Sequence, residues 1–310
     1  MKSVLRKSAA CVGVLVLLNS SQLVHAQFSL GDAVNYAAMY EGNGGHNFQI
    51  NSGVNAGNSY SIVGNIGVGN VLGGSLAALQ FNSPATINGN INFAGTNTSK
   101  FQNSGGIYTG SLNFGVAQVN TDLTYLNNLS ATLGAETGTT ISINGTTNIN
   151  ATSGHLVNGD DVFTINDGGL SLGNGQTLTI NGTASQSVVL NFDYGNNNIA
   201  FGGNISLTGG ITANQVLFNI IGGNGATLSG GGQYGTSANY ELQYGTFLDP
   251  DGKIVINAVN LYGHVYGGDS QDMQINSGAD IIAVPEPAPV AFMGVSLCLF
   301  SILRLRARSI

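Results

Sequence analysis

The first candidates for chemistry in this 310-residue chain are acidic residues at predicted turns. Asp249 and Asp251 flank a proline and precede Gly252, and carboxylate oxygens at such spacing can begin a calcium loop. The regular acidic positions and closing glutamate of an EF-hand are missing, and Asp-Pro-Asp-Gly is also favourable turn chemistry. We therefore expect a turn and neither a metal nor a cofactor. The same reasoning predicts solvated corners at Asp160 with Asp161 and at Asp269 with Asp272.

Residues suited to catalysis are few. Beyond the N-terminal segment the histidines are His46, His155 and His264, with no His-Glu-x-x-His spacing and no Gly-x-Ser-x-Gly elbow at a strand-to-helix junction. Two carboxylates could serve a glycosidase. Such a site also needs groups that hold the sugar, and residues 27–287 contain neither arginine nor tryptophan. We expect a protein that is not an enzyme, with a polysaccharide-degrading enzyme as an alternative.

Residues suited to binding are more numerous. Thr177 and Thr179 form the kind of pair that an ice-binding face uses, although ice recognition needs a regular ladder of such pairs. Several tyrosines can either stack on sugar rings or fill the core. These are Tyr234, Tyr240, Tyr244, Tyr262 and Tyr266.

The candidate side chains must be positioned by the elements of the body. A short unit recurs there: apolar-polar-Ile-Asn, followed by glycine or another small residue. Alternation with period two predicts a strand with one buried face, and Asn-Gly supplies the positive φ of a tight turn. The unit recurs with its isoleucine at Ile50, Ile87, Ile143, Ile165, Ile180 and Ile275. The body is therefore predicted to be many short strands joined by sharp corners.

Two all-β arrangements fit these strands. A sandwich of β-hairpins is one, because Asn-Gly commonly joins hairpin strands. The units lack a consistent hairpin spacing, and many are followed by another turn after three to five residues, as in residues 64–70. Repeated short strand and turn is typical of a β-solenoid whose coils bury a narrow apolar row. We favour an irregular β-solenoid.

One stretch has a helical period instead. Within residues 115–133 apolar side chains recur every three or four positions, with Asp122 near the start and Gly134 after the end. The sequence predicts one amphipathic helix beside the solenoid, with Asn127 and Asn128 toward water.

The C-terminus has three consecutive parts. They are the sorting motif Val284, Pro285, Glu286 and Pro287, an uncharged apolar run over 288–303, and a basic end over 304–308 that contains Arg304, Arg306 and Arg308. As a helix the run extends about 24 Å, which barely crosses a hydrocarbon core of about 30 Å. The arginines predict that the last residues stay inside. A buried core helix is the alternative.

This tail (284–310) resembles the PEP-CTERM sorting signal of Gram-negative bacteria. The resemblance implies that a membrane-embedded exosortase recognises the Pro-Glu-Pro and cleaves near it, and that the protein reaches the cell surface or extracellular matrix through an inner-membrane intermediate. By that resemblance, residues 284–287 are recognised by another enzyme and are not a catalytic site of this protein. Such tags often occur in species that make exopolysaccharide.

The N-terminus predicts export by the Sec route. Residues 1–26 combine basic residues, a short apolar stretch and small residues before a cut, as in a signal peptide. Cleavage after Ala26 would leave Gln27 as the first residue. A retained anchor is the alternative.

Composition narrows the function of the body. Residues 27–287 carry all 15 acidic residues but only Lys100 and Lys253 as basic ones, a formal charge of −13. A phosphate-binding surface needs clustered basic residues, so nucleic acid is excluded as a partner. Cys11 and Cys298 both lie in the terminal segments, so the body has neither a disulfide nor a thiolate metal site.

The C-terminal part of the body resembles the choice-of-anchor A family of bacterial surface proteins. The resemblance rests on residues 216–220, 227–230, 244–251 and 261–268, and Asp249-Pro250-Asp251 stands where that family commonly has Ala-Pro-Asn. The order of elements over most of residues 28–283 also resembles ice-binding-like adhesion domains, which implies a β-solenoid with one long helix.

We therefore predict three regions: a signal peptide over 1–26, a β-solenoid surface domain over 27–283 and the sorting signal over 284–310. The predicted function is a non-enzymatic surface or matrix protein that acts in biofilm, exopolysaccharide or envelope structure and adhesion. An ice-binding or carbohydrate-binding adhesin is the alternative.

Overall fold

The computed structural model describes residues 28–42, 45–51, 61–70, 78–82, 85–195, 197–222, 225–230, 240–268 and 271–284. The predicted signal peptide with its cleavage site Ala26 and Gln27 lies outside these ranges, and so does the tail from Pro285 onward, including the apolar run and its arginines. None of the helices within these ranges has the length and apolar character that crossing a membrane requires.

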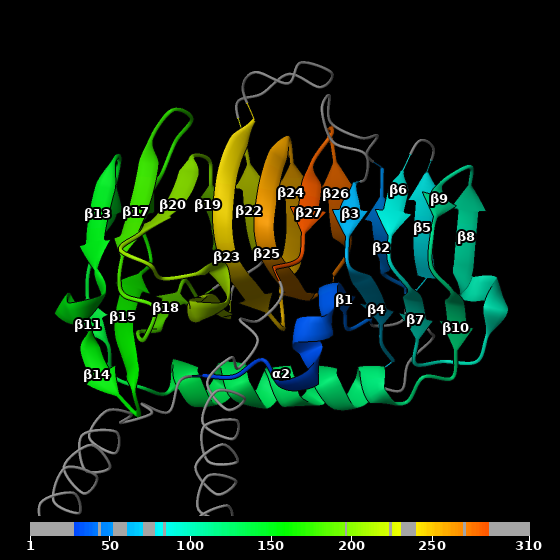
Figure 1. Ribbon diagram of the computed structural model, residues 1–310, viewed down its shortest axis with the longest axis horizontal. Coiled ribbons are helices and arrows are strands. Elements are labelled where there is room, and N and C mark those ends of the chain that lie inside the picture. Colours follow the sequence, from blue (N-terminus) through cyan, green and yellow to red (C-terminus); the bar gives the residue numbers. More distant parts are fainter. Residues whose placement is uncertain are drawn as a thin grey trace, which may run out of the picture.

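The strands wind into a three-sided β-solenoid, and nearly all of them pair in parallel (Figure 1). The first face contains β10 (Leu112–Phe114), β7 (Ile91–Phe93), β4 (Asn65–Val68), β1 (Tyr36–Tyr40), the second halves of β25 (Val259–Gly267) and β23 (Glu241–Asp249), β21 (Val216–Ile221), β18 (Val188–Asp193), β15 (Asp160–Asn166) and β11 (Thr139–Thr140). The second face contains β12 (Ile143–Asn144), β16 (Leu170–Ser171), β19 (Asn198–Phe201), β22 (Gly225–Ser229), β24 (Lys253–Asn257), β26 (Met273–Asn276), β2 (Asn47–Ile50), β5 (Ala78–Asn82) and β8 (Phe101–Ser104). The third face contains β13 (Thr147–Asn150), β17 (Thr177–Asn181), β20 (Asn204–Thr208), the first halves of β23 and β25, β27 (Asp280–Ile282), β3 (Ile62–Val63), β6 (Thr86–Asn88) and β9 (Ile107–Tyr108). The remaining elements are short. They are the 3₁₀ turns η1 (Gly31–Asn35), η2 (Thr98–Lys100), η3 (Ala151–Ser153) and η4 (Ala213–Gln215), and the strand β14 (His155–Val157), which pairs antiparallel to β15.

Two long strands turn from the third face to the first without a loop, and each does so at a glycine. Gly245 of β23 has φ +136° and Gly263 of β25 has φ +148°, a backbone region that other residues rarely adopt. The two glycines are paired in register, and a Cβ added to Gly263 would lie 2.0 Å from the Gly245 carbonyl oxygen. Glycine is therefore required at this corner on both conformational and steric grounds.

The coils do not follow one another in sequence order along the solenoid. Strands β1 to β10 advance toward one end, the helix α2 (Gln118–Gly134) returns along the first face, and strands β11 to β27 advance from the other end. The last coil then stacks on the first, through β25 on β1, β26 on β2 and β27 on β3. Figure 1 shows this junction where the orange β27 lies beside the blue β3.

The interior of the solenoid is filled by the inward-facing half of the repeat. All six isoleucines of the recurring unit are fully buried, and the asparagine that follows each is at least partly exposed. Phenylalanines stack between coils, with the rings of Phe218 and Phe247 4.5 Å apart and nearly parallel. The prediction of a β-solenoid, as opposed to a sandwich of hairpins, is confirmed.

The helix covers the outer side of the first face. Val119, Leu123, Leu126 and Leu133 are buried against outward-facing side chains of the sheet, which form a second apolar core. Burial of each such leucine contributes roughly 1.5–3 kcal/mol. The predicted helix is confirmed, although it begins at Gln118.

Two details of the predicted helix were wrong. Gly134 lies within the helix rather than after it, and a Cβ there would meet Ile221 Cδ1 at 2.7 Å, so it allows close packing on β21 instead of stopping the helix. Asn127 is not a free surface residue, because it is half-buried and its side chain donates to Glu41 Oε1.

Candidate functional site

The second face presents two rows of amide side chains, which we call the amide face. Alternation along β2 turns Phe48 and Ile50 inward and Gln49 and Asn51 outward. Parallel, in-register pairing then repeats this arrangement on the coils beside it. The glutamine row is Gln274, Gln49, Gln80 and Gln102, and the asparagine row is Asn257, Asn276, Asn51 and Asn82.

Hydrogen bonds between coils hold these side chains. Gln274 Nε2 donates to Gln49 Oε1 at 3.3 Å, and Gln80 Nε2 donates to Gln102 Oε1 at 3.0 Å. In the other row, Asn51 Nδ2 donates to Asn276 Oδ1 at 2.9 Å, and Asn82 Nδ2 donates to Asn51 Oδ1. The rows are thus ordered before any ligand binds.

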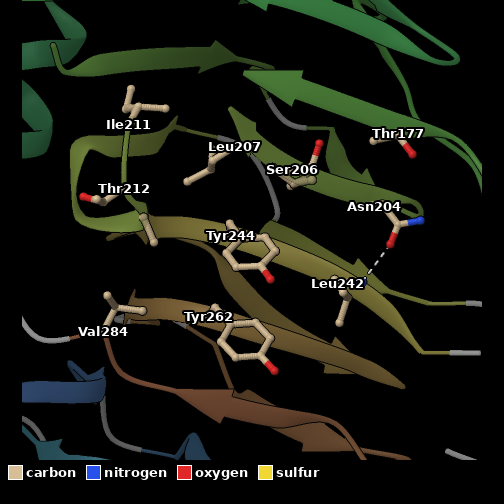
Figure 2. Close-up of a pocket in the computed structure, with 12 residues that line it drawn as sticks. Thr177, Asn204, Ser206, Leu207, Ile211, Thr212, Leu242, Tyr244, Tyr262 and Val284 are labelled. Atoms are coloured by element: carbon tan, nitrogen blue, oxygen red, sulfur yellow. Dashed lines mark hydrogen bonds between the residues drawn. The ribbon is translucent and has the colours of Figure 1, made fainter. Parts of the chain in front are cut away.

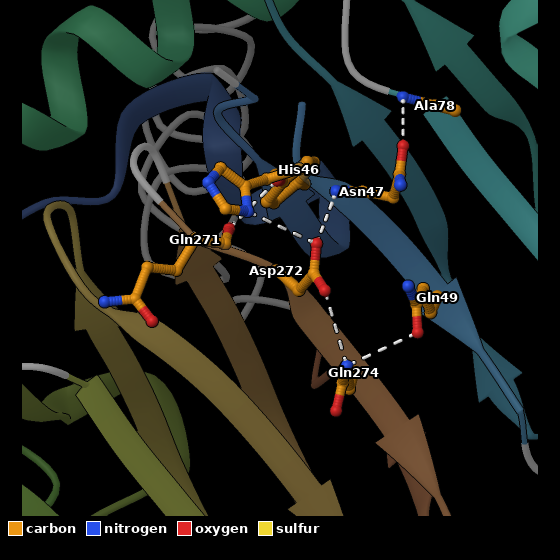
Figure 3. A network of polar contacts seen from close by, with 8 residues as sticks. His46, Asn47, Gln49, Ala78, Gln271, Asp272 and Gln274 are labelled. Atoms are coloured by element: carbon orange, nitrogen blue, oxygen red, sulfur yellow. Dashed lines mark hydrogen bonds and ion pairs between the residues drawn. The ribbon is translucent and has the colours of Figure 1, made fainter. Parts of the chain in front are cut away.

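A network of polar contacts holds the edge of the amide face at which the strands begin (Figure 3). The Asp272 carboxylate accepts a hydrogen bond from Asn47 N at 2.7 Å, and Asn47 Oδ1 accepts one from Ala78 N at 3.2 Å. His46 Nδ1 lies 3.7 Å from the same carboxylate. These contacts connect three successive coils.

The chemistry of the amide face follows from its regularity. Each amide has two N–H donors and a carbonyl oxygen, so a single bond to its neighbour leaves a donor and lone pairs for an outside partner. The groups repeat about every 4.8 Å across strands and about every 6.6 Å along them. Such an array suits an ordered surface that presents water or hydroxyl groups at a similar repeat.

A second candidate lies on the third face, where a cavity of about 650 Å³ opens beside β20; we call it the tyrosine groove (Figure 2). Tyr244 and Tyr262 form one wall, with ring centroids 5.0 Å apart and planes 14° apart. Burial, and less strongly the neighbouring Tyr262, raise the pKa of Tyr244, so its hydroxyl remains a donor. No lining residue within the described ranges carries a formal charge.

The residues predicted to bind ligands lie in different environments in the structure. Tyr266 and Tyr240 are buried, as the core alternative expected, while Tyr244 and Tyr262 line the groove. Tyr234 lies outside the described residues. Thr177 and Thr179 lie on β17 in register with Asn204 and Ser206, so the pair does not extend into a threonine ladder.

The acidic candidates act mainly as hydrogen-bond acceptors for the backbone. Asp249 Oδ1 accepts from Gly252 N at 3.0 Å, which confirms a turn there. The expectation of solvated corners was wrong for Asp160 and Asp161, which are buried. Asp160 accepts hydrogen bonds from Phe28 N and Ser187 Oγ. Asp269 lies outside the described residues, within which no group of three potential metal ligands occurs.

The histidines and the sorting motif are placed as follows. His264 is fully buried, His46 is half-exposed beside Asp272, and His155 is exposed. Of the sorting motif only Val284 is described, and its carbonyl accepts a hydrogen bond from Asn214 Nδ2 at 2.8 Å.

The sequence analysis did not predict the two amide rows. The signal was available in four short segments of the form apolar-Gln-apolar-Asn or close to it, 48–51, 79–82, 101–104 and 273–276. Two of these belong to the recurring unit, but sequence alone did not show that they lie on adjacent coils.

No protein-family model matches the sequence, and neither does any curated protein. Solved structures of ice-binding proteins do resemble the chain. One is from the Antarctic ascomycete Antarctomyces psychrotrophicus, with TM-score 0.53, 17% identity, and coverage of 84% of this chain and 100% of that one. Another is an ice-binding protein from an Arctic yeast, with TM-score 0.52, 13% identity, and coverage of 87% and 99%. At these identities the likeness shows a shared fold, which confirms the predicted resemblance to ice-binding-like domains at that level.

Proposed function

We propose that this chain is an exported, non-enzymatic protein that binds an ordered extracellular surface through its amide face, and that this surface is ice. The observation that carries the proposal is the pair of in-register amide rows, ordered by hydrogen bonds across successive coils. Ordering the side chains in advance lowers the entropy that binding would otherwise cost. The fold shared with ice-binding proteins supports the same reading.

The amide face differs from the regular threonine ladder that the sequence reading required for ice. Its groups are carboxamides, and among the described residues Thr227 is the one threonine in register with the glutamine row. An alternative role for the rows is structural, because Asn and Gln ladders also stabilise stacked strands. Binding and stability must therefore be measured separately.

The test compares two lysine substitutions in the full chain, solubilised in mild detergent. Gln49→Lys places a charge in the middle of the amide face, and Thr179→Lys places one at a half-buried, outward position on the third face. We expect thermal hysteresis in the parent protein, a loss of more than half of it in Gln49→Lys, and no loss in Thr179→Lys. Absence of thermal hysteresis in the folded parent, or equal loss in both variants, would overturn the proposal.

We also propose, from the terminal segments, that the protein is exported by the Sec route and sorted through its PEP-CTERM-like tail by an exosortase-type enzyme. The support is the order of Pro-Glu-Pro, apolar run and basic end in the sequence. Deleting residues 284–310 and fractionating the cells tests this. A truncated protein that still partitions with the envelope would contradict it.

An enzyme that degrades polysaccharide finds no support at the groove. Glycoside hydrolysis requires two carboxyl groups about 5–9 Å apart, and the described lining of the tyrosine groove contains none.

A further inference from the structure

The tyrosine groove occupies a break in the sheet of the third face. Strand β20 ends the three-stranded sheet β13-β17-β20, and within the described residues no backbone ladder joins it to β23. Side chains span the break instead. Asn204 Oδ1 accepts a hydrogen bond from Leu242 N at 2.8 Å, and Gln243 Nε2 donates to the carbonyls of Phe201 at 3.0 Å and Gly203 at 2.9 Å.

These bonds show that the break is a stable part of the fold. Gln243 is fully buried, and a fourth hydrogen bond, from Gly175 N to Glu241 Oε1 at 2.9 Å, connects the next coil to the same segment. Because side chains already use backbone groups on both sides of the break, insertion of an extended peptide strand there is disfavoured. The opening is thus shaped for a ligand recognised by side chains.

The geometry points to a binding site for a neutral sugar chain in the tyrosine groove. A sugar ring combines apolar C–H faces with hydroxyl groups, and the groove offers the matching chemistry. Tyr244, Leu207 and Leu242 provide apolar and aromatic surface, while Ser206 and Asn204 provide hydrogen-bonding groups (Figure 2). The cavity volume lies in the range of small-ligand sites, about 300–1,000 Å³.

The charge of the protein favours neutral sugars over anionic ones. The described lining carries no formal charge, while residues 27–287 carry −13 in total, so an anionic polysaccharide would be repelled and would find no cation in the groove. The ligand is therefore a neutral glycan, bound on a different face from the amide rows and independently of any binding to ice.

The test uses the full chain in mild detergent, titrated calorimetrically with cellohexaose, mannohexaose and maltohexaose, and with hexagalacturonate as the anionic probe. At least one neutral hexasaccharide is expected to bind. Tyr244→Ala should weaken that binding roughly tenfold, because it removes an aromatic contact, and Tyr244→Phe should weaken it less. The exposed leucine variant Leu156→Ala, outside the groove, should bind like the parent.

A second variant keeps the test decisive if Tyr244→Ala fails to fold. Ser206→Tyr fills the groove from β20 and should abolish binding while leaving thermal hysteresis unchanged. Gln49→Lys should leave sugar binding unchanged, so failure of the ice proposal and failure of this one are distinguishable. Binding of none of the neutral probes, binding of hexagalacturonate alone, or equal binding by the Ser206→Tyr protein would overturn the inference.

Discussion

Asn51 donates a hydrogen bond from Nδ2 to Oδ1 of Asn276, 2.9 Å away, although 225 positions separate the two residues in the chain. The bond crosses the junction at which the last coil stacks on the first. Each half of the solenoid therefore covers a sheet edge that the other half would leave exposed. An exposed parallel edge promotes association between molecules.

Truncation after Asn257 should therefore yield an insoluble protein. It removes β25, β26 and β27, and with them the pairing to β1, β2 and β3. Truncation after Val284 is the matched control, because it keeps every described strand, and it should remain soluble with the melting temperature of the full chain. Light scattering and circular dichroism would check this. A soluble, cooperatively folding product from the shorter truncation would show that the junction is dispensable.

The glycine corner between the third and first faces should tolerate no side chain. In Gly263→Ala the new Cβ would lie 2.0 Å from the Gly245 carbonyl oxygen, at a φ of +148°. We expect a loss of more than about 4 kcal/mol of unfolding free energy, a size reserved for severe steric defects. Gly168→Ala is the control, since Gly168 also has positive φ but no atom within 4 Å of the added Cβ, and it should cost about 1–2 kcal/mol. Similar urea midpoints for the two variants would refute the steric argument.

A buried asparagine pair anchors the helix to the first face. Asn219 Nδ2 donates to Asn191 Oδ1 at 2.8 Å, and Asn219 Oδ1 accepts from Ser130 Oγ at 2.6 Å. Asn219→Ala removes both hydrogen bonds and leaves their buried partner atoms unpaired, which should cost about 2–6 kcal/mol because two such penalties add. Asn82→Ala removes a chemically similar ladder residue from the exposed amide face and should cost less than about 1 kcal/mol. Equal losses in chemical denaturation would mean that burial does not set the cost.

The sequence predicted the coil but not how the coils are assembled. Ile50 and Ile275 belong to the same recurring unit, and their burial follows from alternation with period two. Their position on adjacent strands depends on the helix, which carries the chain to the opposite end of the solenoid, so that the later coils advance in the same direction as the first ones and end beside β1 to β3. No local pattern encodes that return, so neither the glutamine row nor the groove between β20 and β23 could be predicted. Asp160 was misjudged for a related reason, since its partners Phe28 and Ser187 lie far from it in the sequence.

Calcium should change neither stability nor binding. Three of the carboxylates first considered as ligands accept hydrogen bonds from backbone amides: Asp249 from Gly252 N, Asp160 from Phe28 N and Asp272 from Asn47 N. A ligand that binds the folded state raises its stability in proportion to the logarithm of its concentration. Melting curves in EDTA and in millimolar calcium should therefore superimpose. A melting temperature that rises with calcium concentration would show that these oxygens accept a metal after all.

The buried His264 should make stability depend on pH near neutrality. Burial lowers the pKa of His264, against an opposing effect of hydrogen bonds to the carbonyls of Tyr36 and Val284. In the unfolded chain a histidine has a pKa of about 6.5, so below that pH the unfolded state binds a proton that the folded state does not. The unfolding free energy should be fully retained above pH about 6.5 and should fall toward the folded-state pKa, by at most about 1.4 kcal/mol per pH unit.

Comparing His264→Gln with the parent isolates this contribution. The variant should be less stable at pH 7.5, because it loses the fitted imidazole, yet its urea midpoint should fall less steeply between pH 7 and 5.5. His155→Gln, at an exposed position, is the control and should keep the parent's slope. If His264→Gln kept the parent's dependence of the urea midpoint on pH and His155→Gln lost it, the pH dependence would arise at the surface and not at the buried His264.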